Sequence, residues 1–196
     1  MNKRIITISR EFGSGGRYIG EEIARKLGIA FYDKEIIAKV AEKTGMALDL
    51  IEQKGEYAPT KSAFAYAFVG RYPNGSSIDD ILHQAQREII LEAVDKEPCV
   101  IVGRGADYIL KDRKDGINVF IHGDQEKKAD RICNLYHKTT PQAIKLMHDM
   151  DKKRSINYKY YTEQDWGVCK NYTISLNSSE LGYEKCMDLI MDLYRD

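Results

Sequence analysis

The sequence predicts an α/β fold in which a parallel sheet is covered by helices on both faces. Two observations lead to this class: five short apolar segments alternate with amphipathic segments, and the first apolar segment runs directly into a glycine-rich turn. Strands buried on both faces read as continuous apolar runs, and helices between them make consecutive strands parallel. Because ligands of such sheets bind beyond the carboxyl ends of the strands, the glycine-rich turn marks the expected site.

The expected strands are short and rich in β-branched residues, as buried strands are. They cover residues 4–9, 29–32, 98–103, 117–121 and 172–176. The segments between them carry apolar residues at helical spacing and predict helices. These helices are expected from the glycine-rich turn to Leu27, from the N-cap candidate Asp33, from residues 76–80 to about 95, around residues 129–136, from Thr140 onward, and over residues 180–194.

We expect one domain over residues 1–196, with two segments that extend from its core. Residues 46–74 mix glycine, proline and aromatic residues, and we interpret them as short helices and loops of a lid-like insertion. The insertion as a whole is placed at about residues 34–95, and a lid at about residues 138–166.

The charge balance excludes some classes of partner. Thirty Lys and Arg residues balance thirty Asp and Glu residues, so the formal net charge is zero. This argues against nucleic-acid and anionic-membrane binding, since both need an excess of basic residues. No apolar run reaches the length of a signal peptide or a membrane span, so a cytoplasmic protein is expected. The oligomeric state is left open.

The four cysteines are too far apart in the sequence to form a C-x-x-C pair, and no histidine pair has metal-ligand spacing. We therefore expect buried, reduced thiols rather than a zinc site or a disulfide framework.

The first strand, the glycine-rich turn and the following helix have the layout of a phosphate-binding loop. Such a loop aims backbone N–H groups at phosphate oxygens, and the helix N-terminus adds to the attraction. The common pattern G-x-x-x-x-G-K-[ST] supplies a lysine for the phosphates and a hydroxyl for Mg²⁺. Here Arg10 replaces the first glycine, Gly16 the lysine and Arg17 the hydroxyl residue. The layout points to a nucleoside triphosphate, while the missing lysine leaves the activity open.

Two interpretations of this turn compete. A tight strand-to-helix turn needs glycines for packing alone, whereas three glycines within four residues, followed by a cation, favour phosphate binding. We assign nucleotide binding to Gly13, Ser14, Gly15, Gly16, Arg17 and Tyr18.

Arg17 is the candidate substitute for the lysine, because a guanidinium donates in a fork that matches phosphate. An exposed arginine in the first turn of a helix is the structural alternative. No Ser or Thr follows Arg17, so no metal ligand is assigned, and Ser14 is the hydroxyl that could stand in.

Six segments carry a family resemblance: Gly13-Ser14-Gly15 with the helix after it, Phe31-Tyr32-Asp33, residues 102–108, Val119-Phe120-Ile121, Asp151-Lys152-Lys153-Arg154, and Asn177-Ser178-Ser179. Together they resemble bacterial cytidylate kinases. The chain is more similar to the cytidylate kinase-like group that carries the string S-R-E-F-G-S-G-G-R, here residues 9–17. The resemblance covers nearly the whole chain and is weakest over residues 46–75.

This resemblance implies the P-loop fold of nucleoside monophosphate kinases, with a five-stranded parallel core, a monophosphate-binding insertion and a lid. It implies ATP as the phosphoryl donor and small nucleotides as substrates, with Mg²⁺ as the metal. It also implies that Asn177 and Ser178 belong to a loop around the nucleotide base.

Three residues are candidates for the acceptor site. Arg104 ends the third strand between two glycines, where an arginine suits an acceptor phosphate; a salt bridge at a helix start is the alternative. Asp33 ends the second strand and could bind an acceptor hydroxyl, orient the loop, or serve only as an N-cap. Arg71, after an aromatic stretch, is a further candidate contact.

The candidate lid covers residues 149–161. Asp151 and Arg154 lie one helical turn apart, and a lid arginine that closes over the transferring group stabilises its charge. Arg154 is therefore assigned a catalytic role together with Arg17 and Arg104, and Lys153 and Arg131 are assigned as helpers. A solvated helix face is the alternative for Lys153. The lid tyrosines are expected to pack, and no histidine is assigned a catalytic role.

The function that follows is that of a phosphotransferase. It moves the γ-phosphoryl group of ATP, with Mg²⁺, to a small phosphorylated acceptor, preferentially a pyrimidine nucleoside monophosphate such as CMP. Two alternatives stay open. One is an ATP-binding protein of this fold without kinase activity, because the lysine is missing. The other is a kinase of a non-nucleotide small molecule, because the aromatic-rich insertion matches least.

Overall fold

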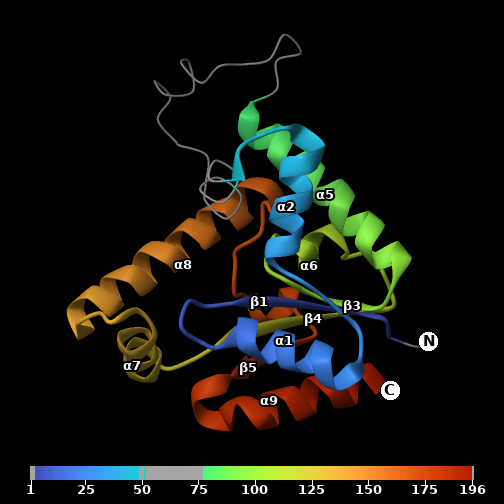
Figure 1. The fold of residues 1–196 in the computed structure, drawn as a ribbon. Coiled ribbons are helices and arrows are strands. Elements are labelled where there is room, and N and C mark those ends of the chain that lie inside the picture. The colour runs from blue at the N-terminus through green and yellow to red at the C-terminus, as the bar shows by residue number, and fades with distance from the viewer. Residues whose placement is uncertain (1–2, 49–50, 52–76, 196) are drawn as a thin grey trace.

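The protein contains a sheet of five parallel strands in the order β2-β3-β1-β4-β5. The structure, a computed structural model, describes residues 3–48, 51 and 77–195 (Figure 1). The strands are β1 (Ile5–Arg10), β2 (Ala30–Tyr32), β3 (Cys99–Val102), β4 (Gly116–His122) and β5 (Ile174–Asn177). Each strand overlaps the range expected from the sequence, so the predicted parallel α/β sheet is confirmed.

Strand β1 lies at the centre of the sheet. Its residue Ile8 pairs with Val102 of β3 on one side and with Val119 of β4 on the other. Ile5, Ile6 and Ile8 have no solvent exposure. A strand with a neighbour on each side and helices on both faces has no solvated face, which explains its continuous apolar sequence. The glycine-rich turn therefore starts from the central strand of the sheet.

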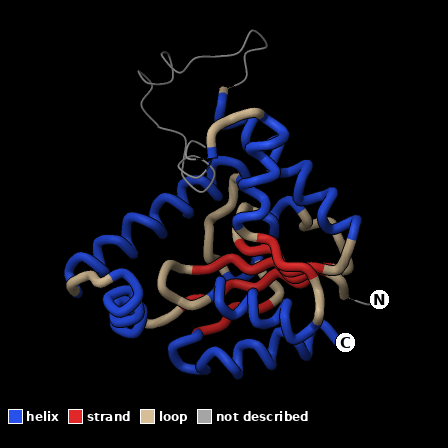
Figure 2. Tube along the Cα trace, viewed as in Figure 1, coloured by secondary structure: helices blue, strands red, loops and turns tan. Residues whose placement is uncertain are grey.

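Helices cover both faces of the sheet (Figure 2). They are α1 (Gly16–Leu27), α2 (Lys34–Thr44), α5 (Ile78–Lys96), α6 (Ala106–Ile109), α7 (Gln125–Tyr136), α8 (Thr140–Thr162) and α9 (Ser178–Arg195), with a 3₁₀ turn at Cys169–Asn171. One face packs on α2, α5 and α6, in a core that contains Ile36 and Ile90. The other packs on α1 and α9, in a core that contains Ile23 and Ile190. The expected helix layers are thus present on both faces.

Helices α7 and α8 pack against each other and extend from the sheet at one end (Figure 1). Their contact is an apolar cluster that includes Ile132 and Met147, and Phe12 of the glycine-rich turn packs on it. Most of the expected lid is thus a single helix, α8, with Pro141 in its first turn. The lid helix therefore touches the core through the same turn that was assigned to the nucleotide.

Capping sequences explain the starts of α5 and α8, whereas the cap expected at α2 does not form. Ser77 caps α5, since its hydroxyl accepts from the Asp80 N–H at 3.1 Å and the Asp80 carboxylate accepts from the Ser77 N–H. Asp33 precedes α2 in the same way, but its side chain makes no capping hydrogen bond. The carboxylate turns to Arg17 instead, because a charged donor binds it more strongly than a backbone N–H. The interpretation of Asp33 as only an N-cap is therefore wrong.

The structure corrects or leaves aside other expectations. Cys169 is exposed, so the expectation that all four thiols are buried is wrong. Helix α6 was not expected, because four residues are too few to show a helical period.

Arg71 and residues 52–74 of the expected insertion lie outside the described residues. Of the helices that the structure describes, none has the length and apolar character needed to cross a bilayer.

Candidate active site

The glycine-rich turn joins β1 to the first turn of α1 with little free space around it. Gly13 and Gly15 have φ angles of 85° and 81°, which L side chains rarely adopt. A Cβ atom at Gly15 would lie 2.7 Å from the ring of Tyr183, and one at Gly13 would lie 2.9 Å from Ile132. These two glycines are therefore required by the packing of the turn itself.

The turn also presents backbone donors that the protein does not use. Within the described part of the chain, the N–H groups of Gly13, Gly15 and Gly16 have no hydrogen-bond acceptor. They lie at the N-terminus of α1, where the partial positive charge of the helix attracts anions. The first N–H groups of any helix lack an intrahelical acceptor, so these donors are compatible both with phosphate binding and with a simple turn.

A cavity of about 540 Å³ opens beside the turn, and we call it the loop pocket. Besides the glycines and Tyr18, its lining includes the side chains of Arg17, Arg131 and Arg154, together with two carboxylates, Glu11 and Glu21. Cations therefore outnumber acids around the unused N–H groups. This is the arrangement that a polyphosphate requires.

Arg17 begins in the first turn of α1 and reaches toward the end of β2. Its Nε atom lies 2.7 Å from Oδ2 of Asp33. The Arg17 side chain is 53% exposed, whereas Asp33 is buried, so the arginine is the partner with room to move. Arg17 lines the loop pocket and Asp33 does not, so the ion pair ties the guanidinium to a residue outside the pocket lining.

Helix α8 contacts the glycine-rich turn through Asp151 and Arg154. These two residues lie one helical turn apart, as the sequence predicts. Oδ1 of Asp151 accepts a hydrogen bond from the N–H of Phe12 at 2.7 Å, and Nη1 of Arg154 donates to the carbonyl of Arg10 at 3.1 Å. Burial raises the pKa of Asp151, although the Phe12 hydrogen bond and the charge of Arg154 act in the opposite direction. The candidate lid is thus bonded directly to the candidate phosphate loop.

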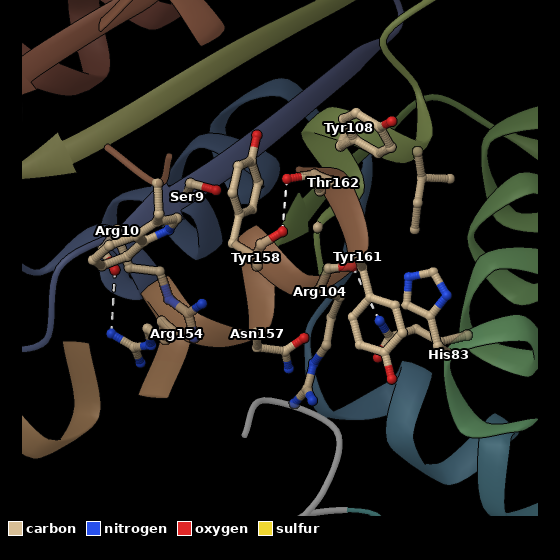
Figure 3. Close-up of a pocket in the computed structure, with 15 residues that line it drawn as sticks. Ser9, Arg10, His83, Arg104, Tyr108, Arg154, Asn157, Tyr158, Tyr161 and Thr162 are labelled. Carbon is tan, nitrogen blue, oxygen red and sulfur yellow. Dashed lines mark hydrogen bonds between the residues drawn. The ribbon is translucent and has the colours of Figure 1, made fainter. Parts of the chain in front are cut away.

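A second pocket lies beyond the carboxyl ends of β1 and β3, and we call it the inner pocket (Figure 3). Arg10, Arg104 and Arg154 are among the residues that line it, and no carboxylate is among them in the described part of the chain. Arg10 and Arg154 also line the loop pocket, so the two pockets meet at these arginines. A lining with three cations and no acid favours an anionic ligand.

Arg104 has the most constrained geometry in the inner pocket. Its φ angle is 63°, and Gly103 and Gly105 on either side also have positive φ angles. A left-handed non-glycine residue is strained and persists only where its surroundings hold it. Here the Gln86 side chain does so by donating to the Arg104 carbonyl at 3.0 Å.

The Arg104 guanidinium is also short of hydrogen-bond partners. Its Nε and Nη1 atoms are buried, and among the described residues they have no acceptor. A buried charged donor without a partner is costly, and an anionic group bound in this pocket would supply the hydrogen-bond acceptors that these atoms lack. The alternative expected from the sequence, an arginine held in a salt bridge, is not seen among the described residues.

Sequence reasoning missed part of the inner pocket. His83 of α5 stacks on Tyr161 of α8, with ring centroids 3.8 Å apart and planes inclined by 5°. Burial lowers the pKa of His83, which favours the neutral ring. Tyr158 of α8 donates its hydroxyl to the buried Asp107 at 2.7 Å. The tyrosines pack as expected, but no sequence signal marked His83, whose partner lies far along the chain.

The expected base loop supports the glycine-rich turn from the other side. The Ser178 hydroxyl lies 2.7 Å from the Ser14 carbonyl oxygen and 3.0 Å from that of His122. Asn177 donates its side-chain amide to Oδ1 of Asp124 at 3.0 Å. Both residues thus have partners that fix β5 to the turn and to β4, and these contacts require no bound base.

Ser14 does not present its side chain to a metal ion. Its hydroxyl donates to the carbonyl of Glu11 at 2.9 Å, and the residue is buried. The idea that Ser14 stands in for the Mg²⁺ hydroxyl therefore does not fit this geometry. No group of three His, Cys, Asp or Glu side chains that could hold a metal ion occurs in the parts of the chain that the structure covers.

The two expected helper residues lie in different places. Arg131 is on α7, outside the expected lid, and its Nη1 donates to the Tyr183 hydroxyl at 2.8 Å. It lines the loop pocket, as a helper at the donor phosphates would. Lys153 is on an exposed part of α8. It lines neither the loop pocket nor the inner pocket.

Comparison with known proteins agrees with this architecture. The sequence pattern of the cytidylate kinase-like family matches residues 5–180. The crystal structure of an uncharacterized protein from Eubacterium ventriosum is similar, with a TM-score of 0.75, 26% identity and coverage of 98% of each chain. The curated proteins contain no match.

Two shikimate kinases are more distant neighbours. The enzyme from Bacteroides thetaiotaomicron gives a TM-score of 0.55 at 17% identity, with 96% of this chain and 97% of that chain covered. The enzyme from Acinetobacter baumannii, solved in complex with shikimate, gives a TM-score of 0.54 at 15% identity, with 97% of this chain and 92% of that chain covered. At these identities the likeness shows the fold alone, which is that of P-loop kinases.

Proposed function

Because the chain belongs to the cytidylate kinase-like family, we propose that it transfers the γ-phosphoryl group of ATP to a small phosphorylated acceptor. The preferred acceptor in this proposal is a pyrimidine nucleoside monophosphate such as CMP. The anionic group of the acceptor enters the inner pocket, which has a free volume of about 60 Å³, and the triphosphate lies along the glycine-rich turn in the loop pocket.

The observation that carries the proposal is the unpartnered guanidinium of Arg104. Its Nε and Nη1 atoms are buried in a pocket whose described lining contains no carboxylate. A phosphate or carboxylate on the acceptor supplies the missing hydrogen-bond acceptors and neutralises the charge. Arg104 therefore binds the anionic group of the acceptor.

Arg154 connects the two substrates. It lines both pockets, and its side chain is only 10% exposed. In phosphoryl transfer the negative charge spreads over the moving group, and a cation fixed between donor and acceptor stabilises that charge. The hydrogen bond from Arg154 to the Arg10 carbonyl fixes the guanidinium at the junction of the pockets.

The donor phosphates meet the unused N–H groups of Gly13, Gly15 and Gly16. Arg17, which lines the loop pocket and pairs with Asp33, supplies the cation in place of the lysine. Asp33 thus acts on the donor side, through Arg17, rather than as a free acceptor contact. When bound, Mg²⁺ screens the charge of the phosphates, and because it keeps several waters it needs few protein ligands.

A non-nucleotide acceptor is the second candidate, favoured by the same guanidinium. An arginine binds a carboxylate in the same forked geometry as a phosphate. One of the neighbours of the same fold was solved with shikimate, a non-nucleotide ligand. The inner pocket is therefore also suited to a small carboxylic acid that carries a hydroxyl group.

The test is ADP formation from MgATP with a panel of acceptors. The panel contains CMP, UMP, dCMP, AMP and GMP, and small hydroxy acids that carry a carboxylate. The proposal predicts turnover with a pyrimidine monophosphate above the rate without acceptor. Turnover only with a hydroxy acid moves the assignment to the second candidate. Measurable ATP binding without turnover on any acceptor contradicts both and leaves a nucleotide-binding protein without kinase activity.

A further inference from the structure

A buried lysine lies directly behind the glycine-rich turn, although the turn itself lacks one. Lys128 projects from α7, and its Nζ atom lies 2.6 Å from Oε2 of Glu11. The Lys128 side chain is only 9% exposed. The same carboxylate oxygen accepts a hydrogen bond from the N–H of Gly123 at 3.2 Å. One oxygen of Glu11 is thus shared between α7 and the end of β4.

Glu11 is part of the turn and shapes it through its main chain. Its carbonyl oxygen accepts from the N–H of Ser14 at 3.3 Å and from the Ser14 hydroxyl at 2.9 Å. Its own N–H donates to the carbonyl of Ile121 on β4. The side chain and backbone of Glu11 therefore help to fix the turn on the sheet, in addition to the contacts from Asp151 and Ser178.

Helix α7 also touches the turn at a second point. A Cβ atom at Gly13 would lie 3.1 Å from the backbone oxygen of Lys128 and 3.2 Å from its Cβ. The backbone of the turn therefore rests on the helix at the residue that carries the lysine. A shift of α7 at Lys128 relative to the turn would therefore also change its contact with Gly13.

The charge of Glu11 would oppose an anionic ligand if it were unpaired. A carboxylate within the turn repels phosphate oxygens bound to the backbone of the same turn, and partial burial weakens the screening by water. An unpaired buried carboxylate also costs folding free energy, so it turns toward solvent when it can. A cation at 2.6 Å removes both effects.

We propose that Lys128 is a positioning residue of the phosphate loop, which neutralises Glu11 and holds the turn in its anion-binding form. Its Nζ atom bonds to Glu11, and Lys128 lines a separate cavity on the other side of Gly13 and not the loop pocket. Lys128 therefore places a positive charge at the turn from the side of α7, whereas the lysine of a common phosphate loop contacts the phosphates directly. The effect on ATP rests on the proposed function, whereas the effect on the turn does not.

The experiment compares Lys128→Met, Glu11→Gln, the double variant and Lys96→Met. Lys96→Met removes the same charge from the exposed end of α5, beside the amino end of β3 and away from the turn. Amide hydrogen exchange at Ser14 and Gly123 is measured without ligand by NMR, and MgATP affinity is measured by calorimetry. Circular dichroism verifies that each variant is folded.

Lys128→Met should speed exchange at Gly123 and weaken MgATP binding about tenfold or more, which corresponds to the loss of one charge-assisted contact. The double variant, which is neutral and similar in shape, should restore both within about threefold, because no unpaired carboxylate is left. Lys96→Met should match the wild type in both measurements.

Two outcomes overturn the proposal. One is unchanged exchange at Gly123 and Ser14 in Lys128→Met. The other is a double variant that binds ATP as weakly as Lys128→Met, because Lys128 then contacts the nucleotide itself. If the wild type does not bind MgATP, the proposed function fails, and the exchange data still decide whether Lys128 positions the turn.

Discussion

Arg17 and Asp33 form an ion pair between the start of α1 and the end of β2, with 2.7 Å between Nε and Oδ2. The pair unites two residues that were assigned to different parts of the site. Because Asp33 is buried and Arg17 is about half exposed, the carboxylate is the fixed member and the guanidinium is the member that can follow a phosphate. In the function proposed above, Asp33 is therefore the residue that keeps the substitute cation near the turn.

Arg17→Ala should remove most of the phosphoryl transfer rate while the protein stays folded. The cation is lost from the lining of the loop pocket, and one contact to a transferring phosphoryl group contributes a factor of about 10² or more in rate. Arg25→Ala on the same helix is the control, because Arg25 is exposed and pairs only with Glu22 among the described residues. Steady-state kinetics of both variants test this. Turnover of Arg17→Ala close to that of Arg25→Ala contradicts the substitute-cation role.

Arg104→Met should weaken acceptor binding without lowering the stability of the free protein. The substitution removes a charge whose Nε and Nη1 atoms are buried without an acceptor, and it keeps most of the apolar volume. Thermal unfolding should show a melting temperature equal to or above that of the wild type. Inorganic phosphate should raise the melting temperature of the wild type but not that of Arg104→Met.

The control for Arg104→Met is Arg87→Met, an exposed arginine on α5. It should respond to phosphate as the wild type does. A variant Arg104→Met that is clearly less stable than the wild type would mean that the guanidinium is already satisfied within the protein.

Gly15→Ala should cost more stability than Gly28→Ala, although both glycines have positive φ angles. At Gly28 (φ 65°) nothing lies within 4 Å of a new Cβ, so only the backbone cost of about 1 kcal/mol applies. At Gly15 the new Cβ also meets the Tyr183 ring at 2.7 Å, and overpacking of this kind adds about 1–3 kcal/mol. Denaturant unfolding measures both. Equal losses would show that Tyr183 moves away freely.

The buried Asp107 should make stability depend on pH. Burial raises the pKa of its carboxyl, although the hydrogen bonds from Tyr158 and Ser9 oppose the shift. A carboxyl with a raised pKa binds its proton more tightly in the folded state, so the free energy of unfolding falls as pH rises from the unfolded value of 3.8 through the folded pKa.

Asp107→Asn removes this titration and keeps the shape of the side chain. Its melting temperature should fall less than that of the wild type between about pH 4 and pH 7. Asp188→Asn, exposed on α9, is the control and should follow the wild type. Parallel curves for Asp107→Asn and the wild type would show that the Asp107 carboxyl does not titrate in this range.

The parts of the fold that could be predicted are those with local signals. The continuous apolar sequence of β1 indicates a buried strand. The glycines that follow indicate a tight turn, and the apolar periodicity after them indicates helix α1. The Ser77 cap and its Asp80 partner lie within one helical turn of each other and follow a known pattern. Such features need no knowledge of the tertiary arrangement.

The contacts that complete the site could not be predicted, because they join residues far apart in the sequence. The Lys128 to Glu11 pair and the His83 to Tyr161 stack exist only once α7, α5 and α8 are placed around the sheet. Asp33 is another example of a contact that the sequence does not reveal. Its position before α2 predicts an N-cap, but its carboxylate binds Arg17 instead. A charged side chain binds the strongest partner within reach, and the sequence alone does not show which partner that is.

The most direct test of the central claim follows the γ-phosphoryl group itself. ATP labelled at the γ-phosphate is incubated with Mg²⁺, CMP and the wild-type protein or Arg17→Ala, and the nucleotides are separated. We predict that the wild type forms labelled CDP and that Arg17→Ala forms very little. Arg104→Met should form labelled CDP only at high CMP concentration. Absence of labelled CDP with a wild type that binds ATP would contradict the account, as would equal label transfer by Arg17→Ala.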